Sequence, residues 1–529
     1  MGAIEAMSID RDFCIIGAGP AGLQLAYYLE KAQRSYIVLE KGDSPGTFFK
    51  TFPRHRKLIS INKVHTGHCD PEINYRWDWN GLLCDDDRFM FRNYSQKYFP
   101  HADDLVRYLK DFASLQNLSV QCNVDIQLVQ RDAGGFRIRD TQGNEFSCRN
   151  LVIATGLSKA YVPEIPGIEL VEQYDQVTMD AADFANQRVL IIGKGNSGFE
   201  TADHLVETTA LIHVASPHPV KFAWQSHFVG NLRAINNNLL DTYLLKCQNA
   251  TLEVEIGKIE KNGSKFLATV NYQRAMGSSE VIEYDRIICC TGFRMDRSIY
   301  SEDCKPEMTI HDRFPSLDSS WQSVNIPGLY FAGALTQSRD FKKTASAFIH
   351  GFRYNVRALA SILLNRQYEE PIPSRPVAPS PFAMTEAVIQ RVNRSSALWQ
   401  QFSFLCDVLM VSHDGECVDY YEALPFDFVH DSLAGQYERY YTVSLEYGFG
   451  PDDDPFRSSR VAHTDAEAAE NSTFLHPVIR RFSNGTLLDE QHIVENLEAN
   501  WTDEALHVTP LRNYFERTLP PRTAPAAMK

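Results

Sequence analysis

The chain has 529 residues, of which 44% are hydrophobic and 22% charged, and this is the composition of an ordinary globular protein with a large core. Its formal net charge of −15 argues against nucleic-acid binding, because phosphate binding requires a basic face and no basic cluster is longer than that at residues 54–57. Its apolar runs are far shorter than the ~18 residues of a membrane span, and no secretory signal is visible, so we expect a cytoplasmic protein without membrane contact.

The first predicted unit is a strand, a glycine-rich turn and a helix near the N-terminus. An apolar run from Phe13 to Ile16 leads into Gly17, Gly19 and Gly22 at G-x-G-x-x-G spacing, and a helical pattern follows over residues 23–29. In such a turn the first glycine permits a tight bend, the second lets the backbone approach a pyrophosphate, and the third allows close helix–strand packing. Glu40 ends the next strand, where it can accept hydrogen bonds from a ribose. The unit predicts a dinucleotide site.

A second unit of the same kind begins at residue 189. A strand over residues 189–192 is followed by Gly193, Gly195 and Gly198, then by a helix and a strand over residues 210–215. An NAD site would have Asp or Glu at the end of that strand, whereas this chain has three groups that can donate to a 2′-phosphate: Ser216, His218 and Lys221. NADPH is therefore favoured over NADH; a solvated loop is the alternative interpretation of His218 and Lys221.

The cysteines decide between two kinds of flavin chemistry. The chain has eleven, with no C-x-x-C and no His/Cys cluster at metal spacing, so we predict neither a metal site nor a disulfide framework. Cys289 and Cys290 are adjacent, and consecutive Cα atoms lie ~3.8 Å apart, below the ~4.4–6.8 Å of ordinary disulfides. On a buried strand the two side chains point to opposite faces. We therefore predict that they pack in the core, which leaves oxygen as the simplest electron acceptor.

The order of segments predicts the fold. Residues 150–156, "NLVIATG", resemble the strand that returns to the FAD site in flavoproteins with two dinucleotide domains, and this resemblance implies FAD at the first turn. We predict an α/β fold with two Rossmann-like domains, in which the FAD domain is interrupted by the NADP domain. The expected units are an FAD domain in two parts (1–168 and 326–370), an NADPH domain (169–325), a proline-rich connector (371–382) and an accessory region (383–529). The aromatic-rich accessory region either caps the active site or forms a subunit interface of a homo-oligomer, and the tail at 520–529 is expected to be disordered.

Two further resemblances bear on activity. "GKGNSGFE" at residues 193–200 resembles the corresponding turn of the flavin-containing monooxygenases, and "CCTGF" stands where they carry "ATGY". This resemblance implies that bound NADP⁺ shelters a C4a-hydroperoxyflavin, formed with O2, which oxygenates a small molecule, for example by N-hydroxylation. The "FxGxxxH" signature is missing before the second turn, which disfavours the Baeyer–Villiger and simple amine-oxygenase subclasses.

A more specific resemblance covers nearly the whole chain. The stretches 53–67, 227–246, 346–359 and 474–481 resemble the FAD-dependent oxidoreductase domain-containing flavoproteins of the endoplasmic reticulum, within the same superfamily. This resemblance implies an alternative function, an NADPH:acceptor reductase that passes electrons to a partner protein. The location is not carried over, because the chain ends "PAAMK" instead of a retention tetrapeptide. A nucleotide-bound scaffold without turnover is disfavoured by the two intact turns.

The monooxygenase resemblance also implies roles for single residues. Asn62 matches the asparagine near the flavin N5 edge and the nicotinamide, where its amide would hold NADP⁺ and donate to the hydroperoxide; a turn asparagine is the alternative. Arg56 offsets pyrophosphate charge, holds an anionic group of the substrate, or lies in a solvated basic loop. His350 is interpreted as a core histidine rather than a proton donor, and residues 236–238 are hypothesised to border the substrate.

The remaining candidates are cofactor contacts. Thr47, Phe48 and Phe49 are expected along the FAD, and Phe348 and Ile349 begin a helix whose N-terminus should face the flavin pyrimidine. The other expected contacts with FAD or NADPH are Pro20, Ala21, Lys41, Val124, Thr155, Gly156, Asn196, Ser197, Thr291, Gly292 and Gly333.

Overall fold

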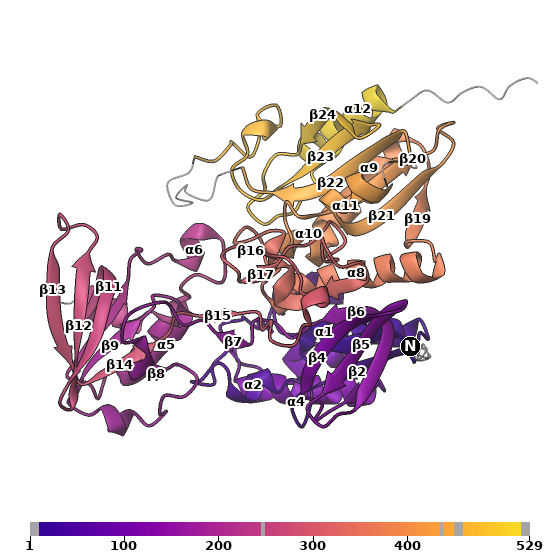
Figure 1. The fold of residues 1–529 in the computed structure, drawn as a ribbon. Helices are drawn as coiled ribbons and strands as arrows, with labels where there is room; N and C mark the ends of the chain where they lie inside the picture. The colour runs from indigo at the N-terminus through magenta and orange to yellow at the C-terminus, as the bar shows by residue number, and fades with distance from the viewer. Residues whose placement is uncertain (1–9, 245–248, 434, 436, 449–458, 520–529) are drawn as a thin grey trace, which may run out of the picture.

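Three large β-sheets and two small two-stranded sheets, with their helices, make up the described part of the chain (Figure 1). The computed structural model describes residues 10–244, 249–433, 435, 437–448 and 459–519. The tail predicted to be disordered, 520–529, lies outside the described residues.

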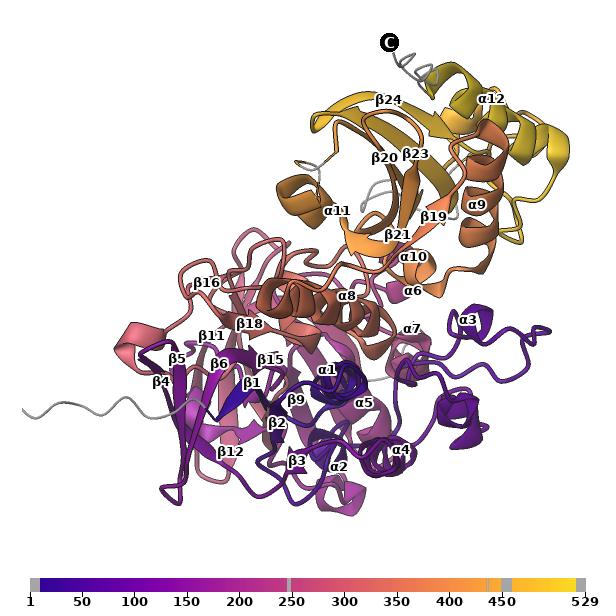
Figure 2. The same cartoon turned by 90° about the vertical axis from the view of Figure 1, so that its right-hand side faces the viewer.

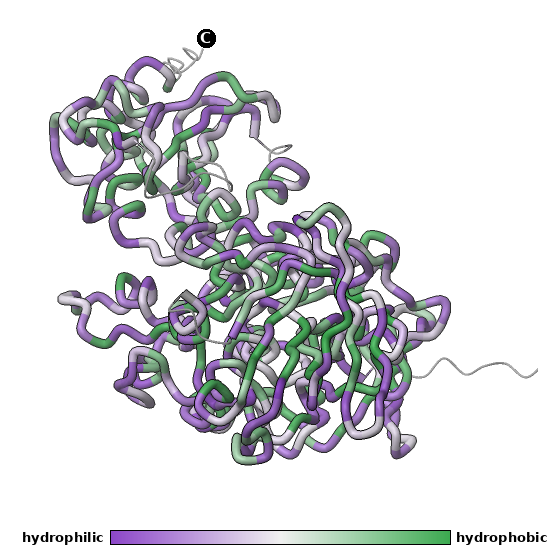
Figure 3. The backbone as a smooth tube through the Cα atoms, turned by 90° about the vertical axis from the view of Figure 1, so that its left-hand side faces the viewer, coloured by the Kyte–Doolittle hydropathy of each residue, from purple (hydrophilic) through white to green (hydrophobic). Residues whose placement is uncertain are grey.

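The first sheet carries the N-terminal glycine turn. Ile15 lies between Val38 and Val152, and all three are buried, so the central strands form an apolar layer (Figure 3). Its parallel strands have the order β3 (Val120–Gln121), β2 (Tyr36–Leu39), β1 (Arg11–Ile16), β6 (Glu145–Ile153) and β18 (Leu329–Phe331). An antiparallel hairpin, β4 (Ile126–Asp132) and β5 (Gly135–Asp140), continues the sheet from β6.

Helices on this sheet position the first turn. Helix α1 (Pro20–Lys31) packs beside α8 (Ile349–Tyr368) and contacts α4 (Ala102–Leu115). Pro20 stands in the first turn of α1, where its missing N–H costs no hydrogen bond. The loop after β2 carries the short helices α2 (Phe48–Thr51) and α3 (Pro71–Asn74).

The second sheet carries the other glycine turn. Its order is β13 (Ser279–Tyr284), β12 (Lys265–Tyr272), β11 (Ala250–Asn262), β10 (Leu211–Ser216), β9 (Arg188–Ile192), β14 (Arg286–Cys289) and β8 (Glu172–Gln173). The helices that accompany it are α5 (Asn196–Leu205), α6 (Ala223–Ser226) and α7 (Asn238–Leu244). The predicted strands of both units are present, with ends displaced by one or two residues, and the predicted α/β fold with two dinucleotide-binding folds is confirmed.

The C-terminal part is an antiparallel sheet that shares a core with the first. Its order is β19 (Ser374–Val377), β21 (Val418–Pro425), β20 (Leu405–Val411), β22 (Arg439–Glu446), β23 (His476–Ser483) and β24 (Thr486–His492). Val408 and Met410 on one face belong to the same core as α8, whereas Leu409 and Val411 on the other face pack with α9 (Pro381–Arg394) and α12 (Thr509–Thr518) (Figure 2). Helix α8 therefore lies between two sheets.

The strands also bear on the proposed domain boundaries. Strand β18 returns the chain to the first sheet after the second sheet is complete, as the interrupted FAD domain requires. The stretch 371–382, expected to be a connector, contributes β19 and the start of α9 to the C-terminal sheet and its helices. It is thus part of a folded unit as well as a link.

Candidate active site

The first glycine turn contains two glycines that the packing of the protein requires and one that leaves room for a ligand. Gly17 has φ 107°, and a Cβ on Gly22 would lie 2.0 Å from the Gly17 carbonyl oxygen, so neither position accepts a side chain. A Cβ on Gly19 would meet nothing within 4 Å. Gly19 also begins α1 without a side-chain cap. The open space therefore lies where helix N–H groups point, which fits a pyrophosphate.

The second turn repeats this geometry. Gly193 has φ 121°, a Cβ on Gly198 would lie 2.1 Å from the Gly193 carbonyl oxygen, and a Cβ on Gly195 would meet nothing within 4 Å. Gly195 begins α5, again without a side-chain cap. Both turns thus leave space only at the middle glycine, as a dinucleotide requires.

The candidates around the first turn meet at the carboxyl ends of β1, β2, β6 and β18. Glu40 accepts hydrogen bonds from the backbone N–H groups of Ala18 (2.7 Å) and Gly42 (2.9 Å), which orders the turn and leaves lone pairs for a ribose. The predicted contacts that follow or face these strand ends are Pro20, Ala21, Thr155, Gly156 and Gly333. A Cβ on Gly333 would lie 2.7 Å from that of Ala21, which shows how closely the two segments approach.

Other predicted contacts of the FAD site are used within the protein. Lys41 pairs with Asp125 at 3.2 Å, and Val124 donates its N–H to the Glu40 carbonyl at 2.9 Å. The Arg56 guanidinium pairs with Asp103 at the start of α4, and its other terminal nitrogen is buried without a hydrogen-bond partner, so its role beside the pyrophosphate stays a prediction.

The loop over residues 47–54 joins the two dinucleotide-binding parts. Thr47 precedes α2, and its hydroxyl donates to the Ser44 carbonyl at 2.7 Å. Phe49 packs against the core of the first sheet, and Phe48, 43% exposed, contacts Phe52 at 4.9 Å. Phe52 in turn stacks on Tyr174 of the nucleotide part at 5.9 Å. These rings form an aromatic joint between the two parts.

Asn62 is buried and only half satisfied. Its Nδ2 donates to the carbonyls of Ser95 (2.7 Å) and Lys97 (3.4 Å), whereas its Oδ1 is buried without a hydrogen-bond partner. Because the amide nitrogen already donates within the protein, the predicted donation to the hydroperoxide would have to compete with these bonds, and it stays a prediction. The Oδ1 atom is an acceptor that is free to bind a donor.

The end of β10 gathers groups that suit a 2′-phosphate. The Ser216 hydroxyl donates to the His218 carbonyl at 3.0 Å, and the Lys194 ammonium approaches the same carbonyl at 3.2 Å. Lys194 was missed by the sequence reasoning because it occupies a variable position of the turn; a basic residue between two turn glycines was the available signal. Burial lowers the pKa of Lys194, and Lys221 is exposed. The neighbouring acid, Glu253, is occupied by Arg274 at 2.7 Å.

Asn196 organises a loop instead of facing a nucleotide with its amide. Nδ2 donates to the carbonyls of Gly230 (3.2 Å) and Asn231 (2.8 Å). Oδ1 accepts from the Arg233 N–H (3.0 Å) and from Asn236 Nδ2 (3.1 Å). All four hydrogen-bonding positions of the amide are thus used, and a nucleotide contact by Asn196 is left to its backbone N–H.

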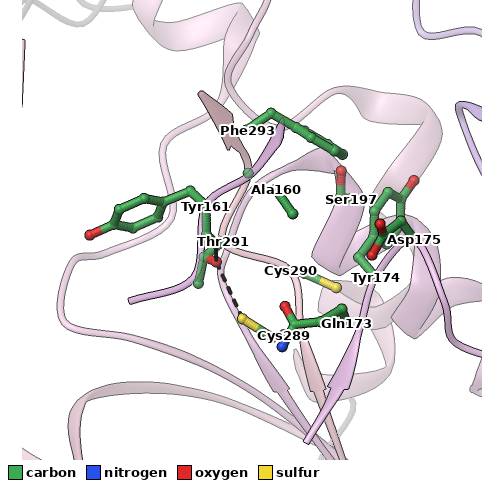
Figure 4. Close-up of a pocket in the computed structure, with 11 residues that line it drawn as sticks. Ala160, Tyr161, Gln173, Tyr174, Asp175, Ser197, Cys289, Cys290, Thr291 and Phe293 are labelled. Carbon is green, nitrogen blue, oxygen red and sulfur yellow. Dashed lines mark hydrogen bonds between the residues drawn. The ribbon is translucent and has the colours of Figure 1, made fainter. Parts of the chain in front are cut away.

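The adjacent cysteines lie on opposite faces of the second sheet, as predicted. Cys290 packs with the core on the α5 side, and Cys289 packs with the core on the other side. Figure 4 shows the Cys289 sulfur directed toward Thr291, whose oxygen is 3.3 Å away, and the Cys290 sulfur turned toward Tyr174. Burial raises the pKa of both thiols, so they stay protonated. The two cysteines line a narrow pocket together with Ser197 and Phe293 (Figure 4). Gly292 lines this pocket too.

A larger cavity, of about 330 Å³, lies before the N-terminus of α8, where the three parts of the chain meet. The first part contributes Trp79, Thr344, Ala345 and His350, the nucleotide part contributes the segment 223–234, and the C-terminal part contributes Trp399, Gln400, Phe402 and Tyr447. The sequence predicted that the aromatic-rich accessory region either caps the active site or forms a subunit interface, but it singled out none of these four residues. Phe348 begins α8 without a side-chain cap, and Ile349 follows, buried.

His350 is a buried ring at the edge of this cavity. It stacks on Trp79 at 4.1 Å and on Phe348 at 5.8 Å, and its Nδ1 is buried without a hydrogen-bond partner. Its pKa lies well below the usual value, because of burial and of the charges of Arg353 and Arg233. The imidazole is therefore neutral at physiological pH, as suits the interpretation as a core histidine.

The described residues contain neither a candidate metal site nor a candidate membrane-spanning helix. No group of three or more His, Cys, Asp or Glu side chains in the described ranges is arranged to hold a metal ion. Within the same ranges, no helix has the length and apolar character needed to cross a membrane.

Comparison with known proteins agrees with this geometry. Residues 14–333 match the family of pyridine nucleotide-disulphide oxidoreductases. The FAD-dependent oxidoreductase domain-containing protein 2 of Mus musculus is 38% identical over 96% of this chain and 84% of its own length. Among solved structures, the bacillithiol disulfide reductase of Staphylococcus aureus (TM-score 0.52, 17% identical) and a flavin-containing monooxygenase of Stenotrophomonas maltophilia (TM-score 0.51, 20% identical) share the fold over 68% of this chain and 100% and 99% of their own lengths.

These matches bear out the predicted family, and with it FAD and a pyridine nucleotide as cofactors of an oxidoreductase. The chain belongs to the pyridine nucleotide-disulphide oxidoreductase family, in which it is a relative of the FAD-dependent oxidoreductase domain-containing proteins.

Proposed function

We propose that the protein is a single-component, NADPH-dependent flavin monooxygenase that uses O2 to oxygenate a small molecule. The observation that carries this proposal is the cavity before α8, because aromatic side chains from three parts of the chain line it and none of its described lining residues is a cysteine. An aromatic lining disfavours water beside a reacting flavin, and an oxygenase needs this to avoid losing its reducing equivalents as peroxide.

The residues around the cavity have distinct tasks in this proposal. Lys194 and Ser216 hold the 2′-phosphate that distinguishes NADPH from NADH, and the unpaired Asn62 Oδ1 accepts a hydrogen bond from the nicotinamide amide or a cofactor hydroxyl. The uncapped N–H groups at the start of α8 stabilise negative charge on the pyrimidine side of the flavin. The bound FAD supplies the transfer of electrons from NADPH to oxygen.

The cysteine arrangement supports oxygen over a disulfide as the acceptor. Cys289 and Cys290 lie on opposite faces of a strand, and burial keeps both thiols protonated. An electron relay to a partner disulfide needs a reactive thiolate beside the flavin. We propose a cytoplasmic location for this activity, in a monomer or a homo-oligomer.

The test follows labelled oxygen. The FAD-loaded full chain is supplied with NADPH, isotopically labelled O2 and a mixture of small organic acids, amines and sulfides, and products are analysed by mass spectrometry. A monooxygenase gives a product that carries one labelled oxygen atom for each NADPH consumed. NADPH oxidation without labelled product, together with anaerobic reduction of a protein disulfide, would establish the NADPH:acceptor reductase instead.

A further inference from the structure

The cavity before α8 contains one uncompensated positive charge. Arg233 is the charged residue among its described lining side chains, which include no Asp, Glu or Lys. Its backbone is fixed by Asn196, and its guanidinium lies over the Trp79 ring at 5.1 Å. No carboxylate among the described residues pairs with it, whereas the buried Arg391, for example, pairs with Asp407.

This placement favours an anion in the cavity. Burial lowers the pKa of Arg233, but a guanidinium stays protonated in proteins, so the site retains a full positive charge. A partly buried charge without a counter-ion is unfavourable, and a carboxylate relieves it with two parallel hydrogen bonds. The neighbouring His350 is neutral and supplies no competing charge.

Much of the cavity lining is aromatic. Phe402 and Tyr447 contact edge to face at 5.0 Å, and Arg76 lies over the Trp399 ring at 4.6 Å, which holds that ring in place. The stacked pair of Trp79 and His350 lines the same cavity. Aromatic side chains from two parts of the chain favour a planar ring as the ligand. The volume, about 330 Å³, suits one small bicyclic molecule.

We infer that this cavity binds a planar aromatic carboxylic acid, with its carboxylate on Arg233 and its ring against Trp399, Phe402 and Tyr447 of the C-terminal region. The acid is the substrate if the proposed function holds, and the inference rests on that function for this last point alone. The C-terminal region is then the part of the chain that selects the substrate.

Equilibrium binding to the FAD-loaded full chain tests the inference without turnover. Four probes are compared by calorimetry: 1-naphthylacetate, its neutral amide, 1-naphthylmethylamine and cyclohexylacetate. We expect 1-naphthylacetate to bind at least about tenfold more tightly than each of the others, because only it combines the charge with the planar ring. Equal affinity for the acid and the amide, or preference for the amine, overturns the inference.

Two variants test the carboxylate contact and the ring contact separately. Arg233→Gln should weaken 1-naphthylacetate about tenfold or more and leave the amide unchanged, whereas Phe402→Leu should weaken both. Arg88→Gln is the matched control, since Arg88 is 84% exposed and pairs with Asp86 in its own turn. Unchanged binding of the acid to the Arg233→Gln variant contradicts the assignment. If the acid binds with this dependence on probe and variant, but the labelled-oxygen experiment gives no labelled product, the proposed monooxygenase activity is refuted and the proposed binding site is retained.

Discussion

The two glycine turns have the same backbone packing and different surroundings, and this contrast separates fold from selectivity. In each turn the outer glycines are enforced by carbonyl oxygens of the protein, while the middle one, Gly19 or Gly195, faces open space. The strands that follow differ: β2 leads to Glu40, which binds backbone N–H groups, and β10 leads to Ser216 beside Lys194. The glycines thus shape both turns, and we propose that the residues at the strand ends select the nucleotide.

The largest expected effect comes from filling a tightly packed glycine. Gly22→Ala should abolish FAD binding and lower the melting temperature, because its Cβ would lie 2.0 Å from a backbone oxygen and overpacking costs ~1–3 kcal/mol or more. Gly198→Ala should remove NADPH binding and leave FAD in place. Flavin absorbance after gel filtration and thermal unfolding measure both. In contrast, Gly19→Ala should weaken FAD binding and leave the melting temperature of the apoprotein unchanged. If Gly19→Ala and Gly22→Ala destabilised the apoprotein equally, the proposed difference between the two glycines would be wrong.

Next in size is the selectivity of the second turn. Lys194→Gln should raise the KM for NADPH about tenfold and leave that for NADH unchanged, since it removes one charged contact worth ~1.5–3 kcal/mol. Steady-state kinetics with both nucleotides gives the two values. Lys221→Gln is the companion variant: a larger effect there than at Lys194 would move the phosphate site to the exposed loop.

A third difference between the turns lies two residues after each last glycine. Gln24 exchanges two hydrogen bonds with the backbone of Leu83, whereas Glu200 receives one from Tyr174 and has a pKa raised to about 7, mainly by burial. Because the folded-state pKa exceeds the ordinary 4.5, the protonated form stabilises the fold below about pH 4.5, and this contribution is lost as pH rises through about 7.

Glu200→Gln, which copies the first turn, should therefore flatten the pH dependence of stability. The wild-type free energy of unfolding should fall by up to about 3 kcal/mol more than that of the variant between pH 5 and pH 8. Urea unfolding at several pH values gives the comparison. Parallel curves for the two proteins would mean that Glu200 is already ionised in the folded state at low pH.

The smallest effect is expected at the strand end behind the second turn. The double change Cys289→Ala, Cys290→Ala should leave the rates of NADPH oxidation and flavin reoxidation within about twofold, because both thiols serve packing. Stopped-flow absorbance of the flavin measures them. A severe loss of reoxidation with unchanged flavin reduction would return the pair to a redox role.

Sequence reasoning reached the turns because their logic is local. Three glycines, an apolar strand and a following acid all lie within thirty residues, and the N-terminus of the following helix attracts a phosphate. Lys194 was not predicted because the glycine motif specifies no residue type at its position. The direction of the Asn62 amide depends on the carbonyls of Ser95 and Lys97, which a loop brings back across the chain. The C-terminal wall depends on longer-range packing still, because Phe402 and Tyr447 meet the segment 223–234 only in the folded protein.

Helix α8 lies between the first and the C-terminal sheet, and this position separates cofactor binding from ligand recognition, so that evolution can change one without the other. In the proposed function its N-terminus serves the cofactor, and segments of the C-terminal part supply a wall of the cavity proposed for the ligand. Mutations in the C-terminal part would then change what the enzyme recognises and leave the cofactor sites unchanged. The same sharing makes the sheet inseparable, because cutting it away would strip the apolar cover from α8 and expose the core on which the flavin site is built.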